Sequence, residues 1–299
     1  MFVPDTISKD FMRIIQHWPS CSLNDDVIAT ILQFLPYNIS MYLKIGAISK
    51  QLYTFMSSEE LWCSLLRNKY PFLPITDNYR PMCIEFQRLT RGGNDEYLKH
   101  YCDVIKLTIA GSAHSGKTRL MDQYVFGQVP QYHDSILRKQ ITIFQDKTEL
   151  FEIYDSSRVQ DETHRSSEQA YQQIARLSSA FIIACSVTDR MSFEDLDDHL
   201  KLICRVKDID PCDLPIMLVA TKKDLVSERV VTEDELKSFA EEHKISYMET
   251  SALTGENVDY VFTTLAEMAY IYLAFFAIKR NFDMNANDKG SKKRKCIIN

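Results

Sequence analysis

The glycine-rich segment at residues 111–118 constrains this chain more than any other, because it fits the pattern G-x-x-x-x-G-K-[ST]. An alternating, β-branched segment at 104–110 leads into it, and residues 119–124 have the composition of a helix. A strand, a glycine loop and a helix in that order let backbone N–H groups surround phosphate oxygens at a helix N-terminus. The pattern therefore predicts a phosphate-binding loop.

Within this loop the pattern assigns two roles directly. Lys117 is expected to reach the β- and γ-phosphates of a nucleotide, and the Thr118 hydroxyl is expected to ligate Mg²⁺. For His114 two interpretations stay open, a phosphate contact and the more common solvent-facing position. The other positions expected to line the phosphates are Gly111, Ala113, Ser115, Gly116 and Arg119.

Two later segments indicate which base is bound. Thr221-Lys222-Lys223-Asp224 follows an apolar strand and resembles the [NT]-K-x-D motif of Ras-superfamily GTPases, with Thr in place of the Asn of Ras. The resemblance implies that the Asp224 carboxylate accepts two hydrogen bonds from guanine and that the Lys222 stem packs over the ring. Residues 249–253 resemble the E-T-S-A-[KL] motif, in which the Ala backbone contacts guanine O6. The residues expected here are Ser251, Ala252 and Leu253.

The resemblance to small GTPases runs over residues 103–280. Segments 137–140, 190–195 and 205–208 also look Ras-like, and 180–185 is an apolar run typical of a strand covered on both faces. The resemblance implies an α/β P-loop small-GTPase fold with a mostly parallel sheet flanked by helices. It also implies GTP or GDP and Mg²⁺ as cofactors.

The switch segments depart from the Ras pattern. No Thr lies between Arg119 and Gln140, where the family has a Thr that ligates Mg²⁺ and senses the γ-phosphate. Ser135 is the one Ser or Thr in that stretch, and Tyr132 lies near the expected position. These departures remove contacts that would distinguish GTP from GDP.

The second switch motif keeps its Asp and loses its Gly. Asp155 is expected to hold Mg²⁺ through water, whereas Arg158 stands at the Gly position and Val159 at that of the water-orienting Gln. Gln160 lies one position further along. Arg158 is either an intrinsic arginine finger or, as we favour, a solvated loop residue. Because this chemistry depends on positioning and charge stabilisation, we expect slow hydrolysis, which Ala113 in place of a Ras Gly slows further.

Residues 22–67 resemble an F-box, with a helical stripe of apolar residues, a stop at Pro36 and a terminal Leu61-Trp62. Asn24 and Leu52 depart from the family's Pro and Trp, and an unrelated three-helix cap is the alternative. An F-box implies docking on a Skp-type adaptor that links to a cullin ubiquitin ligase. Trp62 is expected to be a core anchor. The residues carried over for docking are Leu23, Val27, Ile28, Ile31, Leu32, Pro36 and Leu43.

The remaining segments complete the predicted organisation. Residues 1–21 form an N-terminal segment, and 68–102 a linker with one helix. The tail at 281–299 is polybasic, ends in a C-a-a-X pattern with Cys296, and begins with a polar stretch expected to be a flexible spacer. We expect a prenylated tail on the inner membrane surface, because a prenyl chain and a cluster of cations each bind the membrane weakly and together bind it more firmly. A solvated basic tail or a nuclear localisation patch is the alternative.

Composition narrows the class of protein. The chain has 299 residues, enough for two domains, and a net charge of −6, which disfavours nucleic acid as the main partner. Its eight Cys show neither a disulfide framework nor zinc spacing. An apolar run at 268–278 is shorter than the about 20 residues of a membrane span and is expected to pack in the core. We expect a cytoplasmic protein at the cytoplasmic face of a membrane.

Two functional hypotheses remain open. In one, a nucleotide-controlled switch hydrolyses GTP and uses the F-box as its output. In the other, an F-box adaptor carries a non-hydrolysing GTPase fold that recognises targets or a membrane. The switch departures favour the second for mechanism, and the intact base and phosphate motifs keep guanine nucleotide binding in both.

Overall fold

The chain divides into two compact units, Met1–Asn94 and Asp95–Asn299. The computed structural model describes residues 62, 72–73, 104–128, 136–143, 147–156 and 166–295. In the first unit the described side chains, Trp62, Phe72 and Leu73, are all buried. Trp62 is fully shielded from solvent, which confirms its expected place in a core. The remainder of the predicted F-box lies outside the described residues.

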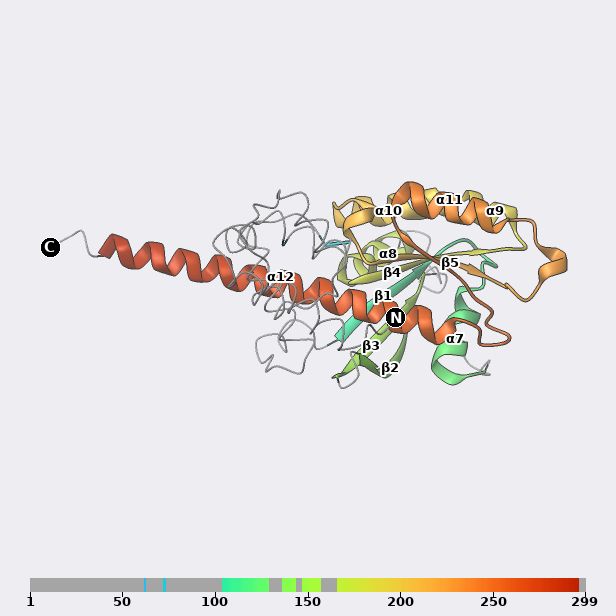
Figure 1. Cartoon of the computed structure of the whole chain (residues 1–299), viewed down its shortest axis with the longest axis horizontal. Helices are drawn as coiled ribbons and strands as arrows, with labels where there is room; N and C mark the ends of the chain where they lie inside the picture. Colours follow the sequence, from blue (N-terminus) through green and yellow to red (C-terminus); the bar gives the residue numbers. More distant parts are fainter. Residues whose placement is uncertain are drawn as a thin grey trace, which may run out of the picture. The chain divides into compact units, whose positions relative to one another are not determined.

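The second unit is an α/β domain on a six-stranded sheet of order β2-β3-β1-β4-β5-β6 (Figure 1). Strand β2 runs antiparallel to β3, and every other neighbouring pair is parallel. The predicted mostly parallel sheet is therefore confirmed. The strands are β1 Val104–Ala110, β2 Ile136–Ile143, β3 Lys147–Asp155, β4 Ala180–Ser186, β5 Ile216–Thr221 and β6 Ser246–Glu249.

Helices cover both faces of this sheet. Helices α7 and α12 pack together on one face, and α8 and α10 pack together on the other. Figure 1 shows α10 and α11 above the sheet. The α-helices are α7 Lys117–Phe126, α8 Ser166–Leu177, α9 Arg190–Glu194, α10 Leu196–Lys207, α11 Glu233–His243 and α12 Val258–Lys295. Within the described residues of this unit there are also two short 3₁₀ turns, η2 Pro211–Asp213 and η3 Val226–Glu228.

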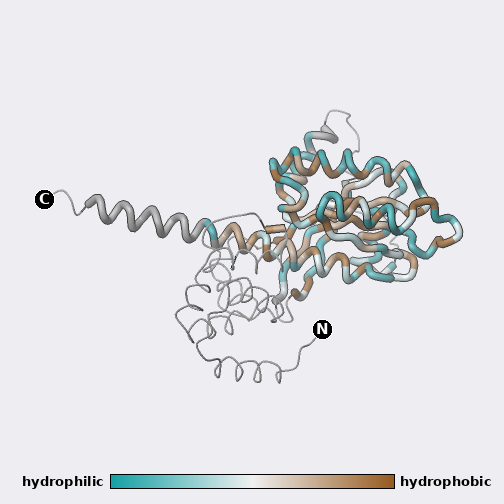
Figure 2. Tube along the Cα trace, turned by 45° about the horizontal axis from the view of Figure 1, so that its top comes forward, coloured by the Kyte–Doolittle hydropathy of each residue, from teal (hydrophilic) through white to brown (hydrophobic). Residues whose placement is uncertain are grey.

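The core lies where the sheet is covered twice. Every residue of β4 and of β5 is buried, as their continuous apolar sequences predict for inner parallel strands. Hydrophobic segments gather inside the domain in Figure 2, and hydrophilic ones lie on the outer helices. From α12 the core receives Phe262, which stacks on Tyr124 of α7 with 4.1 Å between ring centroids.

Helix α12 is longer than the sequence predicted. It continues to Lys295, through the stretch expected to be a flexible spacer, so that expectation is wrong. The stretch holds no Pro, and its single Gly290 costs a helix only about 1 kcal/mol. Among the described helices, one stretch, Val258–Ala277, is long and apolar enough to cross a membrane, longer than the run the sequence suggested. Because 61% of that window is buried, it has the pattern of a core helix, as expected.

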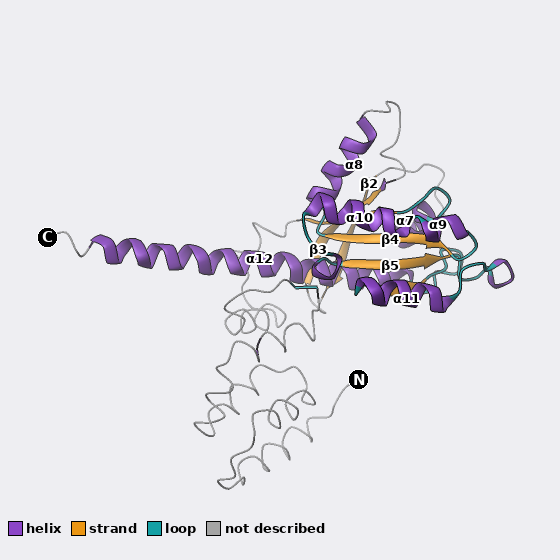
Figure 3. Ribbon diagram, turned by 90° about the horizontal axis from the view of Figure 1, so that it is seen from above, coloured by secondary structure: helices purple, strands orange, loops and turns teal. Residues whose placement is uncertain are grey.

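The topology brings functional loops to one edge. The carboxyl ends of parallel strands point the same way, so the loops after β1, β3, β4, β5 and β6 leave the sheet together. Figure 3 shows loops in teal beyond the arrowheads of β4 and β5. The phosphate-binding loop and the two base motifs lie at this edge, after β1, β5 and β6.

Candidate nucleotide-binding site

The phosphate-binding loop joins β1 to α7 and depends on two glycines. Gly111 has φ 144° and Gly116 has φ 87°, backbone conformations that side chains rarely adopt. A Cβ on Gly111 would lie 2.3 Å from the Ala184 carbonyl oxygen, and one on Gly116 would lie 2.8 Å from Thr221 Oγ1. Both glycines are therefore needed where the loop passes closely over β4 and β5.

The middle of this loop faces outward. Ala113 and His114 are both exposed, and His114 adopts a left-handed conformation with φ 62°. Histidine is one of the few non-glycine residues enriched there. An exposed imidazole is compatible with both interpretations of His114, contact with solvent and contact with a bound phosphate. Arg119, in the first turn of α7, is also exposed.

Lys117 is held inside the loop. Its ammonium group donates to the carbonyl oxygens of Gly111 at 2.7 Å and Ser112 at 2.6 Å, and to Ser115 Oγ at 3.3 Å. Burial lowers the pKa of Lys117, and the charge of Asp155 acts in the opposite direction. The first turn of α7 carries no acidic side chain, so the positive end of the helix dipole is left for an anion.

Two predicted Mg²⁺ ligands meet beside the loop. Thr118 Oγ1 donates a hydrogen bond to Asp155 Oδ2, although the two residues come from α7 and the end of β3. Parallel pairing of β1 with β3 brings these ends together, and Asp155 is buried. A hydroxyl and a carboxylate in contact are the hard oxygen ligands that Mg²⁺ takes in phosphate sites, so the residues present fit this ion.

Thr221 ties the base motif to the phosphate loop. Its hydroxyl donates to the Ser115 carbonyl at 2.7 Å and lies 3.1 Å from the Cys185 carbonyl. This hydroxyl therefore fixes the start of the base motif against β4 and the phosphate loop. The expected nucleotide contact at Thr221 stays a prediction.

The base motifs come together as predicted. Ser251 Oγ donates to Asp224 Oδ1 at 2.6 Å, so the second loop orients the carboxylate expected to recognise the base. Lys222 has φ 61°, which marks the tight turn after β5. The Lys223 N–H donates to the Thr250 carbonyl at 3.0 Å and joins the two loops. The two following positions, Ala252 and Leu253, lie in a turn where Leu253 is 72% exposed.

Comparison with known proteins agrees with this geometry. The family model described as the Ras family matches residues 106–271. The chain belongs to the Ras family. "Ras-like protein rasX" from Dictyostelium discoideum is 32% identical over 205 residues, covering 66% of this chain and 88% of that protein. "Ras-like protein RAS2" from Hydra vulgaris is 31% identical over 204 residues, covering 64% and 95% respectively. The predicted small-GTPase domain is confirmed.

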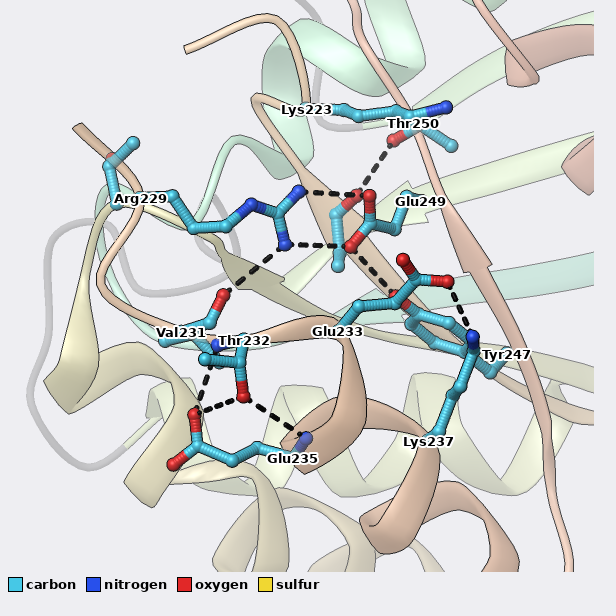
Figure 4. Close-up of polar contacts among 12 residues, drawn as sticks. Lys223, Arg229, Val231, Thr232, Glu233, Glu235, Lys237, Tyr247, Glu249 and Thr250 are labelled. Atoms are coloured by element: carbon cyan, nitrogen blue, oxygen red, sulfur yellow. Dashed lines mark hydrogen bonds and ion pairs between the residues drawn. The ribbon is translucent and has the colours of Figure 1, made fainter. Parts of the chain in front are cut away.

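Sequence reasoning missed an ion pair that supports the base loop of this Ras-family domain (Figure 4). Arg229 donates from Nη1 and Nη2 to the two oxygens of Glu249, at 2.8 and 2.9 Å, and Tyr247 Oη donates to the same carboxylate at 2.8 Å. Burial would raise the pKa of Glu249, but hydrogen bonds from Arg229 and Tyr247 outweigh it and lower that pKa. No local pattern links Arg229 to Glu249, so the sequence gives no signal for the pair.

A second missed cluster supports the phosphate loop. Ser112 Oγ donates to Asp195 Oδ2 at 2.5 Å and lies 3.4 Å from His199 Nε2. Asp195 caps α10, and His199 lies one turn further along that helix. Burial, and then the charge of Lys117, lower the pKa of His199. The bond from Ser112 to Asp195 joins the phosphate loop to α10, with His199 beside it.

Several predicted residues lie outside the described part of the chain. Arg158 and Gln160, the proposed catalytic positions, follow the last described residue of their loop, and Cys296 follows the end of α12. The Ras-family match covers neither residues 22–67 nor the tail, so the F-box and lipidation remain predictions. The predicted docking residues also lie outside the described part of the chain: Leu23, Val27, Ile28, Ile31, Leu32, Pro36 and Leu43.

Proposed function

We propose that this chain is a Ras-like protein that binds GTP or GDP with Mg²⁺ and carries an F-box at its N-terminal end. The observation that carries the nucleotide proposal is the Thr221 hydroxyl bond to Ser115, which ties the phosphate loop to the base loop. Lys117 lies at one end of this arrangement and the Asp224–Ser251 pair at the other. A single guanine nucleotide would span them.

The chain's own residues would divide the work of binding. Lys117 and the amino end of α7 would hold the phosphates, and Thr118 and Asp155 would hold Mg²⁺, which neutralises phosphate charge when bound. Asp224 would select guanine, because adenine lacks the matching pair of hydrogen-bond donors. Ser251 keeps that carboxylate oriented.

Hydrolysis would be slow. The sequence places Arg158 and Val159 at positions where the family has Gly and a water-orienting Gln, and Ala113 stands in the phosphate loop. Phosphoryl transfer in this fold depends on positioning the water and stabilising charge. A long-lived GTP state is the expected consequence, with Arg158 and Gln160 the residues to test for residual activity.

The second candidate function is an F-box adaptor with a non-hydrolysing GTPase fold. The missing Thr between Arg119 and Gln140 favours it, since a nucleotide switch needs contacts that change with the γ-phosphate. Under either proposal, residues 22–67 recruit a Skp-type adaptor and a cullin ligase. The basic tail with Cys296 places the protein at the cytoplasmic face of a membrane.

The nucleotide carried by the purified chain tests these proposals. We would release it, identify it by HPLC and follow loaded GTP over hours. GTP that shows no conversion over hours supports the non-hydrolysing adaptor, whereas slow conversion to GDP that is lost in Arg158→Ala supports the switch. Asp224→Asn is the control, and it is expected to lose guanine selectivity. A protein that takes up no guanine nucleotide after loading would contradict both.

A further inference from the structure

The two loops of the predicted base site are joined by three contacts. Two of them are central: Ser251 Oγ donates to Asp224 Oδ1 at 2.6 Å, and the Lys223 N–H donates to the Thr250 carbonyl at 3.0 Å. The third is an ion pair between Lys223 Nζ and Glu256 Oε1. Figure 4 shows Lys223 beside Thr250, above the Arg229–Glu249 pair. The third contact is not part of either sequence motif.

This ion pair lies at the outer rim and is anchored on both sides. Lys223 is 37% exposed and directly precedes Asp224, whereas Glu256 is 48% exposed. The Ser251 N–H donates to the Glu256 carbonyl at 3.2 Å, so Glu256 is fixed to the loop that orients Asp224. The hydrogen bond with Glu256 raises the pKa of Lys223, and the ammonium stays charged at neutral pH.

We propose that the Lys223–Glu256 pair is a latch that holds the two base loops together and slows release of bound guanine nucleotide. The inference rests on the proposed function of nucleotide binding. A base held by Asp224 on one loop and by Ala252 on the other leaves only when contacts on both loops break. A pair that resists separation of the loops therefore slows departure without contacting the base, and Lys223 and Glu256 are positioning residues.

The effect is modest and depends on salt. A partly exposed ion pair changes a rate by about two- to fivefold, because water and counter-ions weaken it. Base selectivity is expected to stay unchanged, since the bond from Ser251 to Asp224 involves neither Lys223 nor Glu256. This combination separates the latch from a general loss of the fold.

The test is the dissociation rate of a fluorescent GDP analogue from the full-length protein. We expect Lys223→Met and Glu256→Gln each to speed release about two- to fivefold at low salt, and the double variant to match the single ones. The exchange of charges, Lys223→Glu with Glu256→Lys, is expected to restore slow release. Added salt is expected to shrink the difference between the wild type and Lys223→Met.

Lys237→Met is the matched control. It breaks a similarly exposed pair, with Glu233 on α11, and is expected to leave the dissociation rate unchanged. Single variants that release the analogue at the wild-type rate, or effects that add in the double variant, would overturn the latch and leave nucleotide binding intact. Equal melting temperatures check that the fold is unchanged. A wild-type protein that takes up no guanine nucleotide would overturn the proposed function, and the latch with it.

Discussion

Glu235 completes the capping box of α11 with Thr232 and also binds Arg190 of α9. Its carboxylate accepts hydrogen bonds from the Thr232 N–H at 2.9 Å and from Arg190 Nη1 at 2.6 Å. The backbone bond from Thr232, followed by that from Arg190, lowers the pKa of Glu235 from 4.5 to about 2. A carboxyl group with a lowered folded pKa adds stability above its unfolded pKa. That contribution is lost as the pH falls through the folded value.

We predict that Glu235→Gln flattens the pH dependence of stability. The wild type is expected to lose unfolding free energy between pH 4.5 and about 2, and the variant to lose less over that interval because it has no carboxylate to protonate. Urea unfolding at several pH values measures this. The exposed Glu242→Gln on the same helix is the control, and identical slopes in Glu235→Gln and the wild type would contradict the assignment.

Single residues divide into those a motif predicts and those it does not. The positions of Lys117, Thr118, Asp155 and Asp224 follow from short patterns, because each pattern encodes a local geometry. The bond from Thr221 to the Ser115 carbonyl joins residues far apart in the sequence, and no spacing rule anticipates it. Such contacts depend on how the strands pair, which only the folded sheet determines.

At the scale of elements, α12 packs against both α7 and the sheet through one aromatic side chain. Phe262 is fully buried, stacks on Tyr124 at 4.1 Å and meets the Phe151 ring edge-on at 6.5 Å. These three rings come from α12, α7 and β3. Aromatic side chains of this kind dominate core energetics.

We predict that Phe262→Ala destabilises the domain by about 3–5 kcal/mol, because it leaves a cavity among packed rings. Tyr260→Ala is the control on the same helix, since Tyr260 is 56% exposed, and its effect is expected to stay within about 0.5 kcal/mol. Urea unfolding monitored by circular dichroism gives both values. Similar losses in the two variants would mean that burial on α12 does not determine its contribution.

Element identity was easier to predict than element length. Continuous apolar runs gave β4 and β5 correctly, because strands covered on both faces have that pattern. The end of α12 was predicted wrongly, because the polar residues after Lys279 have the composition of a flexible spacer. Few of them, however, strongly disfavour a helix. Polarity reports exposure to solvent, and an exposed helix is as polar as a loop.

For the whole molecule, every described residue of the nucleotide site lies within the unit Asp95–Asn299. We predict that a chain beginning at Asp95 folds and retains guanine nucleotide with the selectivity of the full protein. HPLC of the nucleotide released from that fragment is the measurement, with the same fragment carrying Asp224→Asn as control. A soluble, folded fragment that loses its nucleotide would show that the first unit contributes to the site.

The sequence predicted the architecture of the second unit well, whereas the F-box interpretation of the first unit stays a prediction. Ordered motifs at the ends of successive strands fix an α/β topology, because each motif needs a strand before it. The F-box pattern has no such requirement, since short amphipathic helices occur in many small folds. Its interpretation depends on Leu23, Val27 and their neighbours, and binding to a Skp-type adaptor would decide it.

The bond between Thr221 and Ser115 has a thermodynamic consequence. It connects the loop that would hold phosphate with the loop that would hold the base, so ordering one loop restrains the other. Linkage requires this influence to be mutual: guanosine alone would raise the affinity for pyrophosphate by the same factor as pyrophosphate raises the affinity for guanosine. The affinity of an intact nucleotide would then exceed what its separate halves contribute.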